Sequence, residues 1–154
     1  MKQIFLYIAI LISLGCAAQT KDVTWLTFEE LEEALIKEPK KVLIHFYADW
    51  CVYCKKMEQD VYTKNDIEQV LNDQYYAVKF NVESEDAVIF GGKQFINKNI
   101  GKRRQAYHEI AELLASRDQQ PITLPAVIVM NDNFEIEKKM FQYVPPKELL
   151  TILK

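Results

Sequence analysis

Hydrophobic residues recur at two different spacings along this chain, and the two spacings predict its helices and strands. A spacing of three to four residues is typical of an amphipathic helix. It occurs in 28–37, around Ile67 to Leu71, in 104–116 and after Pro145. Runs of β-branched and aromatic residues favour strands, and they occupy 42–47, 75–82, 126–130 and 134–141.

Residues that favour helix ends lie at the starts of these helical segments. Thr27 with Glu30 three residues later forms a capping box before the first helix. Asn65 or Thr63 is expected to cap the helix that holds Ile67. The last helix begins at a Pro-Pro pair, and proline is well suited to a first helical turn.

The order of the segments predicts an α/β fold. The strands at 42–47 and 75–82 are joined by helices, so we expect them to be parallel. The strands at 126–130 and 134–141 are joined by a tight turn, so we expect them to be antiparallel. The result is a mixed central sheet with helices on both faces, in one domain without repeats or linkers.

The first residues differ from the rest and resemble an export signal. Residues 1–18 have a positive start, an apolar stretch and small residues at the end, which is the pattern of a secretory signal peptide. Cleavage after Ala18 would leave a domain of residues 19–154. Alternatively, Cys16 is the acylated cysteine of a lipoprotein. We therefore expect a periplasmic or secreted protein, with lipid anchoring as the alternative.

Cys51 and Cys54 lie where the strand at 42–47 gives way to a helix-forming sequence. Unpaired N–H groups and the positive end of the helix dipole favour an anion there, so we expect Cys51 to form a reactive thiolate. Cys16 is the only other cysteine, and it is either removed or acylated. A disulfide that closes so short a ring adds little stability. The pair is better explained by redox chemistry.

Two sequence elements resemble the thioredoxin superfamily, and the resemblance covers most of the chain after the first residues. Residues 46–55, Phe-Tyr-Ala-Asp-Trp-Cys-Val-Tyr-Cys-Lys, resemble its strand and Cys-x-x-Cys helix. Residues 124–126, Leu-Pro-Ala, are followed by an apolar strand. They resemble the proline that precedes the corresponding strand in the family. The residues around the cysteines are similar to those of exported thioredoxin-like domains. The resemblance implies a thioredoxin fold.

The same resemblance implies roles for individual residues. Cys51 would be the nucleophile and Cys54 the resolving thiol. Pro125 would follow a cis peptide bond, and Leu124 would offer its backbone to an extended substrate segment. Apart from the resemblance, we expect Trp50 to form an aromatic lip beside the nucleophile, with a place in the core as the alternative.

Three residues depart from the family pattern or lie near it. His45 occupies the position of a buried acid, and it is either a proton acceptor for the resolving thiol or a buried, hydrogen-bonded structural residue. Lys79 matches a family lysine near that acid, or it is a strand residue whose ammonium reaches solvent. Tyr143 falls where many relatives have glycine, and it would narrow access if it faces the site.

The interval between Val82 and Pro125 is longer than in a minimal thioredoxin. We place an insertion at about 84–120, which holds a hairpin around Gly91 and Gly92 and the 104–116 helix. A two-residue turn needs positive φ angles, which a Gly-Gly pair accepts. The insertion either shapes a partner surface or is inert.

The sequence predicts an exported thiol-disulfide oxidoreductase that reduces protein disulfides. The alternative is a copper- or peptide-binding module on the same fold. We expect no cofactor, no resident metal and a monomer. Its partners would be disulfide-containing proteins and an upstream membrane or soluble dithiol donor. The net charge of −3 and the pI of about 5.5 argue against a nucleic-acid binder.

Overall fold

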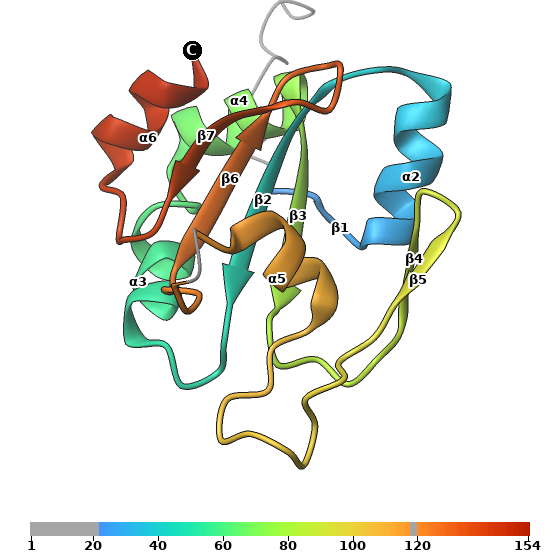
Figure 1. Cartoon of the computed structure of the whole chain (residues 1–154). Coiled ribbons are helices and arrows are strands. Elements are labelled where there is room, and N and C mark those ends of the chain that lie inside the picture. The colour runs from blue at the N-terminus through green and yellow to red at the C-terminus, as the bar shows by residue number, and fades with distance from the viewer. Residues whose placement is uncertain (1–21, 118–119) are drawn as a thin grey trace, which may run out of the picture.

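A computed structural model of the chain describes residues 22–117 and 120–154, and it contains a five-stranded mixed sheet (Figure 1). The strand order is β1-β3-β2-β6-β7. Their bounds are β1 Trp25–Leu26, β2 Lys41–Tyr47, β3 Tyr75–Asn81, β6 Ala126–Met130 and β7 Ile136–Met140. β2 pairs parallel to β3, and β6 pairs antiparallel to β7, as predicted. β6 also pairs antiparallel to β2, which joins the two predicted pairs into one sheet. The expected signal peptide and Cys16 lie outside the described residues.

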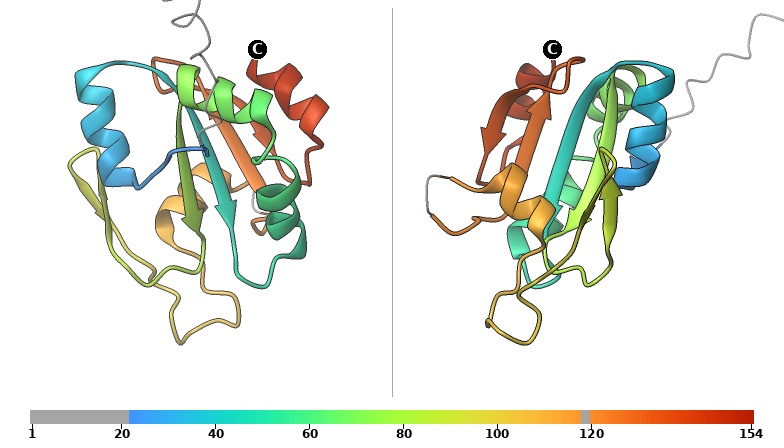
Figure 2. Two further views of the ribbon diagram at one scale, coloured as in Figure 1. Left: turned by 180° about the vertical axis from the view of Figure 1, so that it is seen from behind. Right: turned by 45° about the vertical axis from the view of Figure 1, so that its right-hand side comes forward.

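Helices cover both faces of this sheet. Their bounds are α2 Phe28–Lys37, α3 Val52–Asp60, α4 Asn65–Gln74, α5 Glu109–Ala115 and α6 Pro146–Leu153. Figure 1 shows α5 in front of the sheet, and the view from behind in Figure 2 brings α4 forward. No helix in the described ranges is long and apolar enough to cross a membrane.

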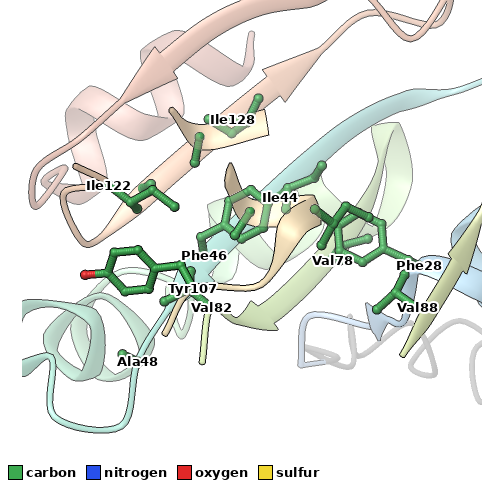
Figure 3. Packing of buried hydrophobic residues seen from close by; sticks show 14 of the residues in the cluster. Phe28, Ile44, Phe46, Ala48, Val78, Val82, Val88, Tyr107, Ile122 and Ile128 are labelled. Atoms are coloured by element: carbon green, nitrogen blue, oxygen red, sulfur yellow. The ribbon is translucent and has the colours of Figure 1, made fainter. Parts of the chain in front are cut away.

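The alternation of side chains along β2 divides the core into two clusters. Ile44 and Phe46 pack with α2 and α5, in the cluster that also contains both cysteines (Figure 3). Leu43 lies in the cluster formed by α3, α4 and α6. Since successive strand residues point to opposite faces, one strand supplies both cores. Each fully buried large side chain contributes about 1.5–3 kcal/mol by burial.

A second, two-stranded sheet lies outside the main one. It consists of β4 Val88–Phe90 and β5 Lys93–Phe95, joined by glycines with φ angles of 63° and 67°, as the Gly-Gly pair predicted. The carboxylate of Glu29 accepts a hydrogen bond from Ile89 N–H, and that of Glu32 accepts one from Gly91 N–H. These two hydrogen bonds hold the hairpin against α2. The other element of the expected insertion, α5, packs on the main sheet.

Several element boundaries differ from the sequence predictions. β1 was not predicted, because its two residues are a strand only through their pairing with β3. Neither Asn65 nor Thr63 caps α4: the N-cap is Lys64 without a side-chain bond, and the Thr63 hydroxyl donates to Gln59 C=O instead. The helix expected at 104–116 begins only at Glu109.

The strand expected at 134–141 is also shorter. Phe134 has a φ of 61°, and the side chain of Asn131 accepts hydrogen bonds from the N–H groups of Asn133 and Glu135. These bonds extend the turn, so that regular pairing starts at Ile136.

Candidate active site

Cys51 is the N-cap residue of α3, as the strand-to-helix pattern predicted. Its N–H donates to Ala48 C=O at 3.0 Å, which closes the turn that follows β2. The Cys54 N–H donates to Cys51 Sγ at 3.1 Å, and the two cysteines form a disulfide. In the reduced protein the same N–H would face a thiolate at Sγ, and a hydrogen bond to the charged form stabilises it.

The proline element lies at the same end of the sheet as the dithiol. Phe46, near the end of β2, pairs with Ala126, the first residue of β6. Pro125 therefore immediately precedes the residue that pairs with the end of β2, from which the chain continues into the cysteine turn. The Leu124–Pro125 peptide bond is cis, as the resemblance implied. Leu124 itself is half-buried, and its substrate contacts remain a prediction.

Exposed aromatic and aliphatic side chains surround the dithiol. Trp50 is 53% exposed and Tyr53 60% exposed, whereas Cys51 is only 5% and Cys54 1% exposed. The Trp50 Nε1–H donates to Glu83 Oε2 at 3.0 Å, which holds the indole at the rim. Tyr143 lies against Tyr53, with ring centroids 6.5 Å apart, and whether it narrows access to the dithiol stays a prediction.

His45 is fully buried in β2, on the strand that leads to the cysteine turn. Its ring contacts are aromatic: Tyr62 at 5.2 Å in an edge geometry, Tyr47 stacked at 6.2 Å and Trp25 at 6.5 Å between centroids. Neither ring nitrogen has a hydrogen-bond partner among the described residues, and the nearby Tyr62 hydroxyl has none either. The expected burial is confirmed, but the expected hydrogen bonding is wrong.

Burial, together with the charge of Lys79, lowers the pKa of His45 to about 3. Its imidazole is therefore neutral across the physiological range. Lys79 pairs with His45 in register on β3, yet its ammonium points to Glu58, 3.6 Å away, and lies 5.4 Å from the Tyr47 ring centroid. Lys79 is therefore a strand residue whose charge reaches the surface.

The thioredoxin-like domain family matches residues 28–154. The chain belongs to the thioredoxin-like domain family. Among curated proteins, it is 44% identical over 48 residues to the thiol:disulfide interchange protein DsbD of Salmonella typhi, which is 30% of this chain and 8% of that protein. The thioredoxin-like chain thus matches about a tenth of the length of such relatives.

Solved structures show the same fold at low sequence identity. The structure named DsbH oxidoreductase superposes with a TM-score of 0.58 at 14% identity and 95% coverage of both chains. The reduced C-terminal domain of DsbD from Neisseria meningitidis superposes with a TM-score of 0.51 at 17% identity, covering 80% of this chain and 87% of that one. These likenesses support the thioredoxin fold of this domain.

The donors that the copper alternative needs all belong to the described residues. The copper alternative requires Cys51, Cys54 and His45 at one point. Within 22–117 and 120–154, no three His, Cys, Asp or Glu side chains are grouped so that they could hold a metal ion.

Two residues near the site were not singled out in the sequence. Glu83, two positions after β3, accepts the Trp50 indole hydrogen bond, and its charge also raises the pKa of Tyr107, after burial as the larger cause. Tyr107 is buried in the same cluster as the cysteines. No local pattern identifies either residue, since both contacts join segments that are far apart in sequence.

Proposed function

We propose that this protein is an exported thiol-disulfide oxidoreductase that reduces protein disulfides through Cys51 and Cys54. The observation that carries the proposal is the Cys51–Cys54 pair at the first turn of α3, with the Cys54 N–H directed at Cys51 Sγ. The relatives named as thiol:disulfide interchange proteins support the same chemistry.

The reaction proceeds by two thiol-disulfide exchanges. The Cys51 thiolate attacks one sulfur of a substrate disulfide, forming a mixed disulfide and releasing the other substrate sulfur as a thiolate. Cys54, deprotonated, then attacks Cys51 Sγ. The second substrate thiolate leaves, the substrate is reduced by two electrons, and Cys51–Cys54 is oxidised. A membrane or soluble dithiol donor would return the pair to its reduced form.

The surrounding residues have assigned roles in this proposal. Leu124, next to cis-Pro125, would pair its backbone with an extended segment of the substrate beside the dithiol. Trp50 would form one lip of the approach, and Tyr143 would narrow it from the side of Tyr53. Cys54 is more deeply buried than Cys51, so it is better placed to attack Cys51 Sγ than a sulfur of the substrate.

His45 would accept the proton of Cys54 during the second exchange. Its neutral imidazole has an unshared nitrogen lone pair without a competing donor. Burial lowers its pKa, so it would hold that proton only transiently. Replacing it by leucine should slow release of the mixed disulfide while leaving the first attack by Cys51 unchanged. Equal rates of release in the wild type and His45→Leu would reject this role.

Export is the cellular part of the proposal. It rests on the signal-like residues 1–18, and it places a single domain of residues 19–154 in the periplasm or outside the cell, with Cys16 acylation as the alternative. Protease accessibility of the domain in intact cells tests export. The mass of the N-terminal peptide of the mature protein tells cleavage after Ala18 from acylation of Cys16.

Reduction of insulin disulfides tests the chemistry. Cys51→Ser should abolish the activity, whereas Cys54→Ala should still attack and accumulate mixed disulfides with substrate. Full activity of Cys51→Ser would refute the proposal. If the oxidised protein oxidises dithiols faster than the reduced protein reduces disulfides, the reductive direction is wrong.

A further inference from the structure

A pocket of about 550 Å³ lies between α5 and two neighbouring loops. The loop that precedes α5 supplies Arg103 and Tyr107, the helix supplies Glu112, and the segment before Leu124 supplies Gln120 and Ile122. None of these residues has a role in the dithiol exchange described above.

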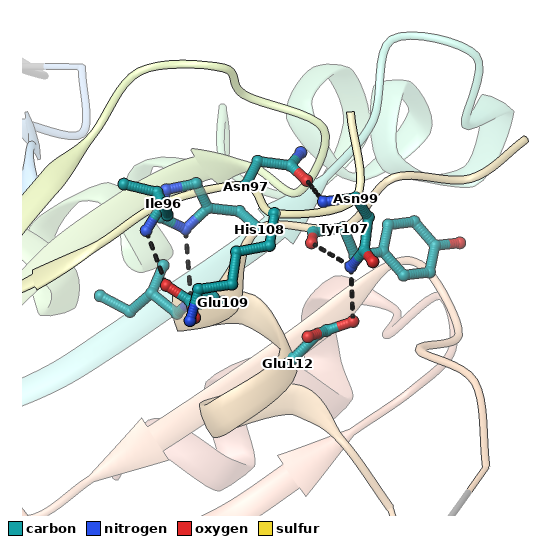
Figure 4. A network of polar contacts seen from close by, with 9 residues as sticks. Ile96, Asn97, Asn99, Tyr107, His108, Glu109 and Glu112 are labelled. Carbon is teal, nitrogen blue, oxygen red and sulfur yellow. Dashed lines mark hydrogen bonds and ion pairs between the residues drawn. The ribbon is translucent and has the colours of Figure 1, made fainter. Parts of the chain in front are cut away.

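The loop wall of this pocket is fixed by a network of side-chain amides (Figure 4). The Asn97 amide, which is 6% exposed, donates to Ala106 C=O at 2.7 Å and to Ser84 C=O at 3.2 Å. The Asn99 amide donates to Tyr107 C=O at 3.4 Å and to the Glu112 carboxylate at 3.3 Å. The loop is therefore held against α5, and the pocket is part of the folded domain.

The pocket adjoins the dithiol end of the sheet. Tyr107 and Ile122 belong to the same buried cluster as Cys51 and Cys54, and Figure 3 shows both on the side of Ala48. Ile122 is two positions before Leu124. An extended segment that pairs with Leu124 advances about 3.3 Å per residue, so it reaches the pocket within about two to four residues.

The loop that brings Arg103 to the pocket is cationic, in a chain of net charge −3. Lys102, Arg103 and Arg104 are exposed and consecutive, and none forms an ion pair within the described ranges. Lys98 differs, because it pairs with Glu109. Among the described lining residues the carboxylate is Glu112, which accepts the Asn99 hydrogen bond and keeps its charge, whereas Arg103 forms no ion pair with it and can bind an incoming anion.

We propose that this pocket is a specificity subsite for an acidic side chain of the protein substrate, two to four residues from the cysteine that Cys51 attacks. The inference rests on the proposed function and adds a substrate preference to it. Arg103 provides the charge, and its fork of donors can bind a carboxylate through two hydrogen bonds. The preference should act mainly on the rate of productive encounter.

Two disulfide-bonded peptides test the proposal, one with Glu and one with Gln two to four residues from each cysteine. The wild type should show kcat/KM about fivefold higher for the Glu peptide at low salt, with a smaller ratio at high salt. Arg103→Glu should abolish the preference. Lys147→Glu makes the same charge change in the first turn of α6 and should keep it. Equal rates for the two peptides in the wild type, or an equal loss for both in Arg103→Glu, would overturn the subsite.

Two further measurements separate failure of the subsite from failure of the proposed function. Hydroxyethyl disulfide is small and neutral, so its reduction reports on Cys51 alone and should be the same in both variants. Binding of the Glu peptide with its cysteines replaced by serine needs no turnover. It should shift the backbone NMR signals of Gln120 and Ile122 in the wild type but not in Arg103→Glu, and unshifted signals in the wild type would reject the pocket even if the dithiol is active.

Discussion

The two histidines of the domain are both fully buried, but they are bonded in opposite ways. His108 Nδ1 accepts a hydrogen bond from Ile110 N–H at 3.2 Å, which leaves Nε2 protonated to donate to Asp86 C=O at 3.1 Å. His45 has no partner at either nitrogen among the described residues. The His108 ring thus forms hydrogen bonds with two backbone groups, one of them at the start of α5. The His45 ring is buried without hydrogen bonds to the described residues.

Under the proposed role of His45, the two histidines are buried for different reasons. His108 satisfies backbone groups that would otherwise be orphaned at a helix N-terminus, so its burial contributes to stability. An unsatisfied buried polar group costs about 1–3 kcal/mol. Such a cost at His45 fits the proton transfer proposed for this residue, because a residue kept for chemistry can lower the stability of the fold.

The largest effect is expected from His108→Leu. The substitution leaves the Ile110 N–H and the Asp86 C=O unpaired, and we expect a loss of about 3 kcal/mol of unfolding free energy, measured by urea denaturation at pH 7.5. His108→Asn is the control, since asparagine is a good N-cap and should recover part of the loss. If leucine and asparagine cost the same, the hydrogen bonds of His108 do not explain its burial.

The second effect is the response of stability to acid. The pKa of His45 is about 3 in the folded protein and about 6.5 when unfolded. Below pH 6.5 His45 is protonated in the unfolded chain but stays neutral in the native protein, so the free energy of unfolding falls as the pH falls. The slope is about 1.4 kcal/mol per pH unit, and the loss reaches about 2 kcal/mol at pH 5.

His45→Leu should remove this part of the acid sensitivity. Burial also lowers the pKa of His108, so the variant keeps a residual slope of the same sign. The difference between wild-type and variant unfolding free energies at pH 7.5 and at pH 5 isolates the contribution of His45. Parallel pH curves for the two proteins would show that the His45 ring titrates normally.

The sequence predicts the elements whose signals are local. The Thr27–Glu30 capping box, the Gly91-Gly92 hairpin and Cys51 at the start of α3 all depend on residues within a few positions of one another. β1 was missed because it depends on a distant segment, through its pairing with β3. The start of α5 was missed because its N-cap is a histidine, which is not among the usual N-cap residues.

The candidate site divides in the same way. Cys51, Cys54 and the cis bond before Pro125 follow from short motifs and their resemblance to a family. The hydrogen bond from Trp50 to Glu83 joins residues 33 positions apart. Likewise, no pattern in β2 shows that His45 is surrounded by aromatic rings from β1 and from the end of α3. Contacts of this kind follow from tertiary packing alone.

The smallest effect is the stability of His45→Leu at pH 7.5, and it should have the opposite sign to that of His108→Leu. Leucine is similar in size and buries no polar atoms, so we expect a gain of about 1 kcal/mol in unfolding free energy. His45→Gln retains unpaired polar atoms and should show no gain. A loss of stability in His45→Leu would mean that ordered water satisfies the ring in solution, and the contrast between the two histidines would then disappear.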